Sequence, residues 1–325
     1  MGEGIARPHR IARGVLSLAL TAAIFALIVR RVPLAALAGA LRDADRGRFL
    51  VLMVANTLFY FAWDTLVLAV TVRWFHGPVR YRELLPVRAA SYVVGFFNTN
   101  LGRGALAAYL SRRLRAPLLE LGSTVLFLVL TEYTQLVIWA MLGLLALRSE
   151  VSRSLLAVAA AISGCWLLVR WLLAPRGWSL SRTFRLATPA RYAATVLLRA
   201  PMFLVSLVLH YHAAHAFGIA IPFAAMLTFL PVIFMIAALP VTVAHLGSTQ
   251  AAWIFFFGQY AAAPRLLAFS LAAHLVFAAT RGVCGLFWLP AAYDDLIDRG
   301  SGEPVVLATA TADAASSSSA RAGVC

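Results

Sequence analysis

The chain has 325 residues, of which 62% are hydrophobic and only 13% are charged, and its mean hydropathy is +0.84. Soluble domains are about 45–50% apolar and about 25% charged, so this composition excludes a cytosolic enzyme, a disulfide scaffold and a disordered chain. The formal charge is +15, and all 28 residues counted as Lys or Arg are arginines. In a chain this apolar we attribute the positive charge to membrane topology rather than to nucleic-acid binding.

Six apolar runs predict membrane-spanning helices, for which about 20 residues suffice. They lie at 15–29, 50–72, 118–147, 155–174, 192–217 and 266–290. Arginines flank the first run on both sides and no small-residue cleavage site closes it, which favours an uncleaved helix over a signal peptide. A short amphipathic segment at 33–48 follows the first run, and a polar, Arg-rich stretch at 175–191 separates the fourth run from the fifth.

Two further apolar stretches, 84–114 and 222–260, are interrupted in the middle. The first break is 98–104, with the sequence NTNLGRG, and the second is Leu239-Pro240 followed by HLGSTQ at 245–250. Glycine and proline leave backbone groups unpaired, which membrane proteins tolerate only where protein or a wet cavity satisfies those groups. We therefore predict an all-α, polytopic transmembrane bundle with two broken, re-entrant helices.

The two halves of the chain resemble each other around these breaks. Leu101-Gly102 precedes Pro117, and Leu246-Gly247 precedes Pro264 at a similar spacing. A long apolar helix follows each proline. Interrupted segments in matching positions of two halves point to a transporter's binding site and to an inverted repeat. The alternative is a chance match in a leucine-rich chain.

The arginines predict the orientation. With six crossings and the N-terminus inside, most arginines fall on the cytoplasmic side, as the positive-inside rule requires. Arg88 counts among these loop arginines, whereas Arg199 and Arg281 fall inside helices and Arg103 falls at a break. We expect an inner-membrane protein with both termini in the cytoplasm. The arginines at 30–48 lie on the wrong side in this topology.

Polar residues inside the apolar runs are the candidate site, because a charge at membrane depth is costly unless it is functional or paired. Asn56, Tyr60 and Asp64 recur every four residues and so share one helix face, which predicts either a cavity wall or structural partners for an arginine on a neighbouring helix. Glu132 lies in the middle of its run, and Arg199 precedes Pro201.

Two hypotheses remain open for these charges. In the first, Arg281 and Arg199 meet an anionic head group while Asp64 and Glu132 balance them or take a cationic one. In the second, the four residues form a structural ion-pair network. The predicted substrate-binding residues are Asp64, Asn98, Asn100, Arg103, Glu132, Arg199, His245, Gln250 and Arg281. No metal, cofactor or catalytic residue is expected, since no nucleotide-binding, hydrolase or metalloprotease motif is present.

The segments LGR at 101–103 and YLSRR at 109–113, with the late proline and Gly-containing break at 240–250, resemble the transmembrane region of the lysylphosphatidylglycerol synthases, or flippase-like family. The resemblance covers about 15–294. It implies binding and translocation of a lipid or lipid-linked precursor between leaflets. The soluble lysyl-transferring domain of the synthases is missing, so lipid aminoacylation is not implied.

Three departures from the family pattern suggest a different head group. Arg103 stands where the family often has an acidic residue, Gln250 stands where it often has Glu, and its common Glu-Arg pair is Glu132-Tyr133 here. We expect one membrane domain at 1–298 and a disordered tail at 299–325. The expected partner is a membrane lipid or lipid-linked substrate, not nucleic acid. The alternatives are a membrane-embedded transferase and an accessory subunit of a separate membrane or peripheral enzyme.

Overall fold

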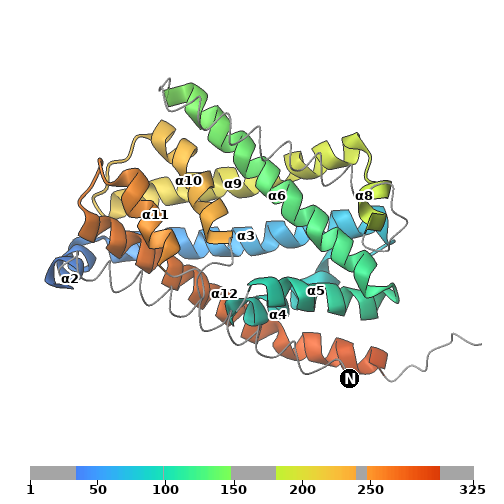
Figure 1. Ribbon diagram of the computed structural model, residues 1–325. Coiled ribbons are helices and arrows are strands. Elements are labelled where there is room, and N and C mark those ends of the chain that lie inside the picture. Colours follow the sequence, from blue (N-terminus) through green and yellow to red (C-terminus); the bar gives the residue numbers. More distant parts are fainter. Residues whose placement is uncertain (1–33, 98, 148–180, 239–246, 301–325) are drawn as a thin grey trace, which may run out of the picture.

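The computed structural model describes residues 34–97, 99–147, 181–238 and 247–300, and every regular element in these ranges is a helix. The elements are α2 (Leu34–Asp43), α3 (Arg46–Phe75), α4 (Tyr81–Phe97), α5 (Thr99–Leu114), α6 (Leu118–Leu147), α8 (Arg182–Leu186), α9 (Pro189–Ala216), α10 (Phe223–Ala238), α11 (Ser248–Phe257) and α12 (Ala263–Gly300). Figure 1 shows them as one helical bundle. The predicted all-α class is confirmed.

Four of the described helices are long and apolar enough to cross a membrane: α3, α6, α9 and α12. They coincide with predicted spans, whereas the predicted spans at 15–29 and 155–174 lie outside the described residues. The span within α12, Ala263–Trp288, agrees with the predicted 266–290, and the helix itself continues through Pro290 to Gly300. Proline interrupts helices less in membrane proteins than in water, since neighbouring groups satisfy the freed carbonyl. The chain is therefore built as an integral membrane protein.

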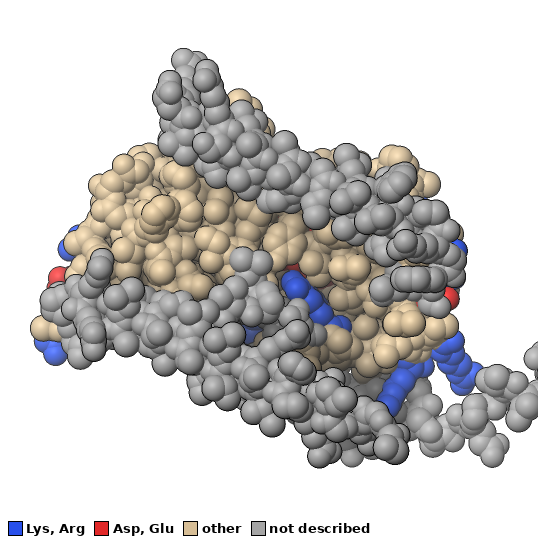
Figure 2. Space-filling model, viewed as in Figure 1, with Lys and Arg blue, Asp and Glu red and all other residues tan. Residues whose placement is uncertain are grey.

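Large apolar side chains on the outside of these helices support a lipid environment. Phe255 is 81% exposed, Phe287 76% and Leu197 71%. A water-soluble monomer rarely presents so much continuous apolar surface. On the face drawn in Figure 2, basic and acidic residues gather at the two ends of the bundle and at one place in its middle, and the described surface between them is uncharged.

Both predicted breaks separate helices. The first is shorter than expected: only Asn98 separates α4 from α5, and residues 99–104 already belong to α5. The two helices turn back on each other where Gly95 faces Gly102, and a Cβ at Gly102 would lie 2.7 Å from the Gly95 Cα. Only glycine permits such close backbone contact. The second break separates α10 from α11, and 239–246 lie outside the described residues.

The described helices form two four-helix sets with the same internal plan. The first set is α3, α4, α5 and α6, and the second is α9, α10, α11 and α12. Each has a long helix, a broken pair and a second long helix. The sets interlock, because α4 packs along α12 while α10 packs along α6. At that second contact Gly143 lies so close to Thr228 that a Cβ would come within 2.6 Å of the Thr228 backbone.

The first helices of the two sets, α3 and α9, lie side by side and run in opposite directions (Figure 1). In the hydrogen-bonded pairs that connect the two helices, the residue number increases along α3 while that of its partner on α9 decreases. The pairs are Asp45 with Ala216, Asn56 with Ser206, Trp63 with Leu198, and Trp74 with Arg191. This inverted relation places the α4–α5 hairpin and the α10–α11 pair at opposite ends of the bundle, with their tips toward its middle.

Polar groups close the end of the bundle where α3, α6 and α8 meet. His76 follows α3, and its Nε2 lies 2.6 Å from Thr124 Oγ1 while Arg182 donates to its Nδ1 at 3.2 Å. The same Arg182 forms an ion pair with Glu120 at 2.6 Å. Burial, together with the positive charge of Arg182, lowers the pKa of His76 below its usual value of 6.5.

This lowered pKa predicts acid sensitivity at that end. The unfolded chain takes up the His76 proton as the pH falls through 6.5, while the folded chain resists it, so the stabilising effect is complete above 6.5 and is lost below. The apparent melting temperature in detergent should fall between pH 7 and pH 5, and less so in His76→Gln. His215→Gln, an exposed site at the other end, is the matched control. Equal acid sensitivity in His76→Gln would contradict this account.

Candidate functional site

The polar stripe on α3 faces the centre of the bundle, and each member bonds to another helix. Asn56 and Asp64 are only 2% and 4% exposed. Ser206 of α9 donates to Asn56 Oδ1 at 2.6 Å, and Tyr60 donates its hydroxyl proton to Glu132 Oε1 of α6 at 3.3 Å. The stripe therefore ties three long helices together near their midpoints, and Asn56 and Tyr60 also line the central cavity described below.

Asp64 is bound by an arginine that the sequence analysis assigned to a loop. Arg88 of α4 donates its Nε to Asp64 Oδ2 at 2.6 Å, and its NH2 group contacts the same oxygen. Tyr92, one turn further along α4, donates to that oxygen at 3.3 Å. The loop assignment of Arg88 was wrong, because the Leu84–Phe97 run enters the bundle as a helix and carries the arginine with it.

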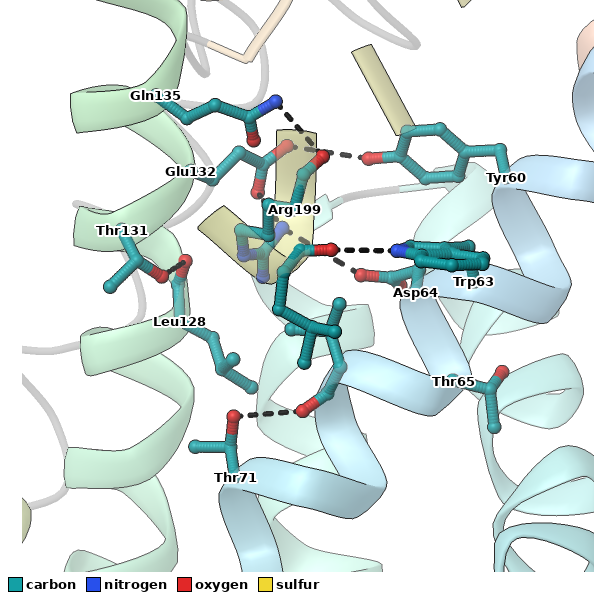
Figure 3. Close-up of polar contacts among 12 residues, drawn as sticks. Tyr60, Trp63, Asp64, Thr65, Thr71, Leu128, Thr131, Glu132, Gln135 and Arg199 are labelled. Atoms are coloured by element: carbon teal, nitrogen blue, oxygen red, sulfur yellow. Dashed lines mark hydrogen bonds and ion pairs between the residues drawn. The ribbon is translucent and has the colours of Figure 1, made fainter. Parts of the chain in front are cut away.

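Arg199 of α9 lies between the two acidic residues, as Figure 3 shows. Its NH1 group is 3.9 Å from Asp64 Oδ1 and 3.9 Å from Glu132 Oε2. The residue is 2% exposed, and its Nε and NH1 atoms make no hydrogen bond to the described residues. Arg199 is therefore an ionic bridge between α3 and α6, held by charge rather than by hydrogen bonds.

The main chain of α9 is also held from neighbouring helices at Arg199, in the turn before Pro201. Pro201 has no N–H, so it weakens the helical bonding of the turn before it. The carbonyl oxygens of Leu198 and Arg199 in that turn accept hydrogen bonds from Trp63 Nε1 at 2.7 Å and from Gln135 Nε2 at 3.0 Å (Figure 3). Side chains of α3 and α6 thus hold the perturbed turn of α9 from both sides.

Two further arginines, Arg281 and Arg103, line the central cavity. The Arg281 guanidinium of α12 lies over the Tyr92 ring, with its Cζ 3.5 Å from the ring centroid, and 4.9 Å from the centroid of Phe277. Its buried Nε has no hydrogen-bond partner. Within the described ranges, neither Arg281 nor Arg103 of α5 forms a hydrogen bond or ion pair with another residue.

A cavity of about 300 Å³ lies where these residues converge. Both halves of the bundle contribute to its wall, including the hairpin glycines Gly95 and Gly102. One part of the wall is polar and carries Tyr60, Arg88, Tyr92, Arg103, Glu132 and Arg281. Another part is apolar and carries Met53, Phe203, Ile233, Phe234, Trp253 and Phe277. A wall of this kind suits a ligand that is itself part polar and part hydrocarbon.

The predicted site residues fall into four groups. Arg103, Glu132 and Arg281 line the cavity, whereas Asp64 and Arg199 lie behind its wall in the ion-pair network. Gln250 is fully buried and is not among the cavity-lining residues, and its Oε1 accepts a hydrogen bond from the Gly247 N–H at 2.7 Å, which caps α11. The remaining three cannot be placed: Asn98, His245 and the side chain of Asn100 lie outside the described part of the chain.

Sequence reasoning missed Arg88 and Tyr92 in the polar wall. Both occupy the apolar stretch that precedes the first break, and an arginine within an apolar stretch was the one sequence feature that could have marked them as site residues. It also missed the contact of Arg281 with the Tyr92 ring, because that contact depends on the packing of α4 against α12.

A scan against protein-family models and a search of curated proteins find no match to this chain.

Proposed function

We propose that this protein binds a lipid or lipid-linked precursor in the central cavity and moves it between the leaflets of the membrane. The cavity carries the proposal, because it places arginines and a carboxylate beside a wall of aromatic and aliphatic side chains. We also propose that the protein belongs with the flippase-like transmembrane regions that its break motifs resemble. On this proposal the substrate is amphiphilic: its head group contacts the polar wall, and its hydrocarbon contacts the apolar wall.

The inverted arrangement of the two helix sets supports the translocation step. Hairpins that enter from opposite ends and meet at a central cavity are the arrangement in which two states open the same site to opposite sides. Here the α4–α5 hairpin packs on α12 of the other set, and α10 packs on α6. Movement of one set against the other would then expose the cavity first to one leaflet and afterwards to the other.

We further propose that this membrane is the inner membrane and that both termini are cytoplasmic. Arginines are more frequent at the end of the bundle formed by the α3–α4, α5–α6 and α8–α9 connections than at the opposite end. The positive-inside rule assigns that end to the cytoplasm.

Lipid retention tests the binding step. The protein purified in detergent should retain a lipid detectable by native mass spectrometry, and filling the cavity should abolish that retention. Ala237→Trp places an indole in the cavity wall, while Ala251→Trp on the exposed side of α11 is the matched control. Bound lipid is expected in wild type and in Ala251→Trp and not in Ala237→Trp, with all three proteins monodisperse. Equal retention by the two variants, or no retention by wild type, would overturn the proposal.

A further inference from the structure

We infer that the lipid head group recognised by this cavity is an anionic phosphate without a compensating cation, and that Arg103 and Arg281 are the residues that bind it. This inference rests on the proposed function and adds the chemical class of the substrate. It follows from the balance of charge around the cavity, from the way Arg281 is held, and from the apolar part of the wall.

The acidic residues at the centre are already balanced by two arginines. Asp64 is bound by Arg88, and Arg199 lies at equal distance from Asp64 and Glu132. Arg88 and Arg199 therefore offset the two carboxylates. Arg103 and Arg281 remain, so this part of the site carries an excess of two positive charges among the described residues. Unbalanced charge at membrane depth is unfavourable, and an anionic ligand would remove that cost.

Arg281 is supported in a way that leaves its hydrogen-bond donors available. An aromatic ring attracts a cation through its face, so the guanidinium over Tyr92 keeps its charge and presents its N–H groups at its edge. Tyr92 is itself fixed by its hydrogen bond to Asp64 and by the Arg88 guanidinium, whose Cζ is 4.9 Å from the ring centroid. The fork of a fixed guanidinium matches two oxygens of a phosphate group.

Glu132 explains why a cationic head group does not suit the same place. Its carboxylate is the only acid in the described cavity wall, and it already accepts from Tyr60 and faces Arg199. An ammonium group would therefore meet one occupied carboxylate and three arginines, Arg88, Arg103 and Arg281. Like charges in so small a space are strongly unfavourable.

The apolar wall decides between a lipid phosphate and a free phosphate ion. Phe203, Phe234 and Trp253 line the cavity and offer the ligand no charge. An inorganic ion would leave that surface without a partner, whereas an acyl or isoprenoid chain would fill it.

Competition binding in detergent tests the inference. Fluorescent phosphatidic acid is the probe, and the competitors are phosphatidylglycerol, a polyprenyl phosphate, phosphatidylcholine, an ammonium lipid of the same chain length, and inorganic phosphate. We expect the two anionic lipids to compete at least about tenfold better than phosphatidylcholine, the affinity difference of one charge-assisted hydrogen bond. Whether phosphatidylglycerol or the polyprenyl phosphate competes more strongly distinguishes a glycerolipid substrate from an isoprenoid one. Inorganic phosphate should compete weakly.

Variants separate this inference from the proposed function. Arg281→Gln and Arg103→Gln should each weaken phosphatidic acid about tenfold and reduce its advantage over phosphatidylcholine, whereas Arg112→Gln at the exposed end of α5 should not. Equal binding of all head groups, a preference for the ammonium lipid, strong competition by inorganic phosphate, or unchanged preference in both variants would overturn the inference and leave lipid binding standing. Binding of no lipid would instead overturn the proposed function.

Discussion

Removing the Asp64 carboxylate should unfold most of the protein. Asp64→Leu leaves Arg88 and Arg199 buried with Glu132 as the one remaining acid near them, and an uncompensated buried charge costs about 3–5 kcal/mol. We expect little monodisperse protein after extraction and a large drop in melting temperature of what remains. Asp43→Asn is the control, because Asp43 at the end of α2 is exposed and forms no ion pair with the described residues, so its loss should cost little.

The other member of the pair should matter less. Arg88→Met leaves Asp64 with Arg199, which is 3.9 Å away and can approach, and with the hydroxyl of Tyr92. The loss in Arg88→Met should therefore be smaller than in Asp64→Leu. A loss in Asp64→Leu no greater than that in Asp43→Asn would show that the central charges do not hold the helices together.

Substituting the glycine at the hairpin crossing should have the second large effect. In Gly102→Ala the new Cβ would lie 2.7 Å from the Gly95 Cα and 2.8 Å from the Ser91 carbonyl oxygen. Both neighbours are backbone atoms, so α4 and α5 must separate. Overpacking of this kind costs about 1–3 kcal/mol. Because Gly95 and Gly102 line the cavity, lipid retention should fall along with the melting temperature.

Gly104→Ala is the matched control on the same helix. A Cβ at Gly104 meets nothing within 4 Å, and alanine stabilises a helix interior by up to about 1 kcal/mol relative to glycine. The melting temperature should stay the same or rise. If Gly102→Ala and Gly104→Ala behave alike, α4 and α5 do not cross as closely as described.

The elements that hydropathy specifies were predictable from sequence. The spans at α3, α6 and α9 agree with their predicted ranges to within a few residues, because a helix in lipid must be apolar over most of its length. The breaks were also located, since glycine, proline and asparagine interrupt otherwise apolar runs. The extent of the first break was overestimated: residues 99–104 continue as helix, because the close contact with α4 allows glycine to remain helical there.

The pairing of charges depends on packing that one sequence does not contain. Asp64 has Arg88 as its partner because α4 enters the bundle beside α3, and the same arginine is equally consistent with a loop when judged by composition. The different contacts of the individual arginines were likewise not predictable from the sequence. Arg199 lies between Asp64 and Glu132, while Arg281 of α12 lies over Tyr92 of the other helix set, and neither pairing can be read from the order of residues along the chain.

Transbilayer movement of lipid is the measurement that tests the central claim most directly. The purified chain is reconstituted alone into liposomes that contain a fluorescent phosphatidic acid in both leaflets, and a membrane-impermeant quencher is added outside. We predict that quenching proceeds past the outer-leaflet fraction in wild type and stops there in Ala237→Trp. Quenching that stops at the outer leaflet with folded wild-type protein, as in protein-free liposomes, would contradict translocation by this cavity.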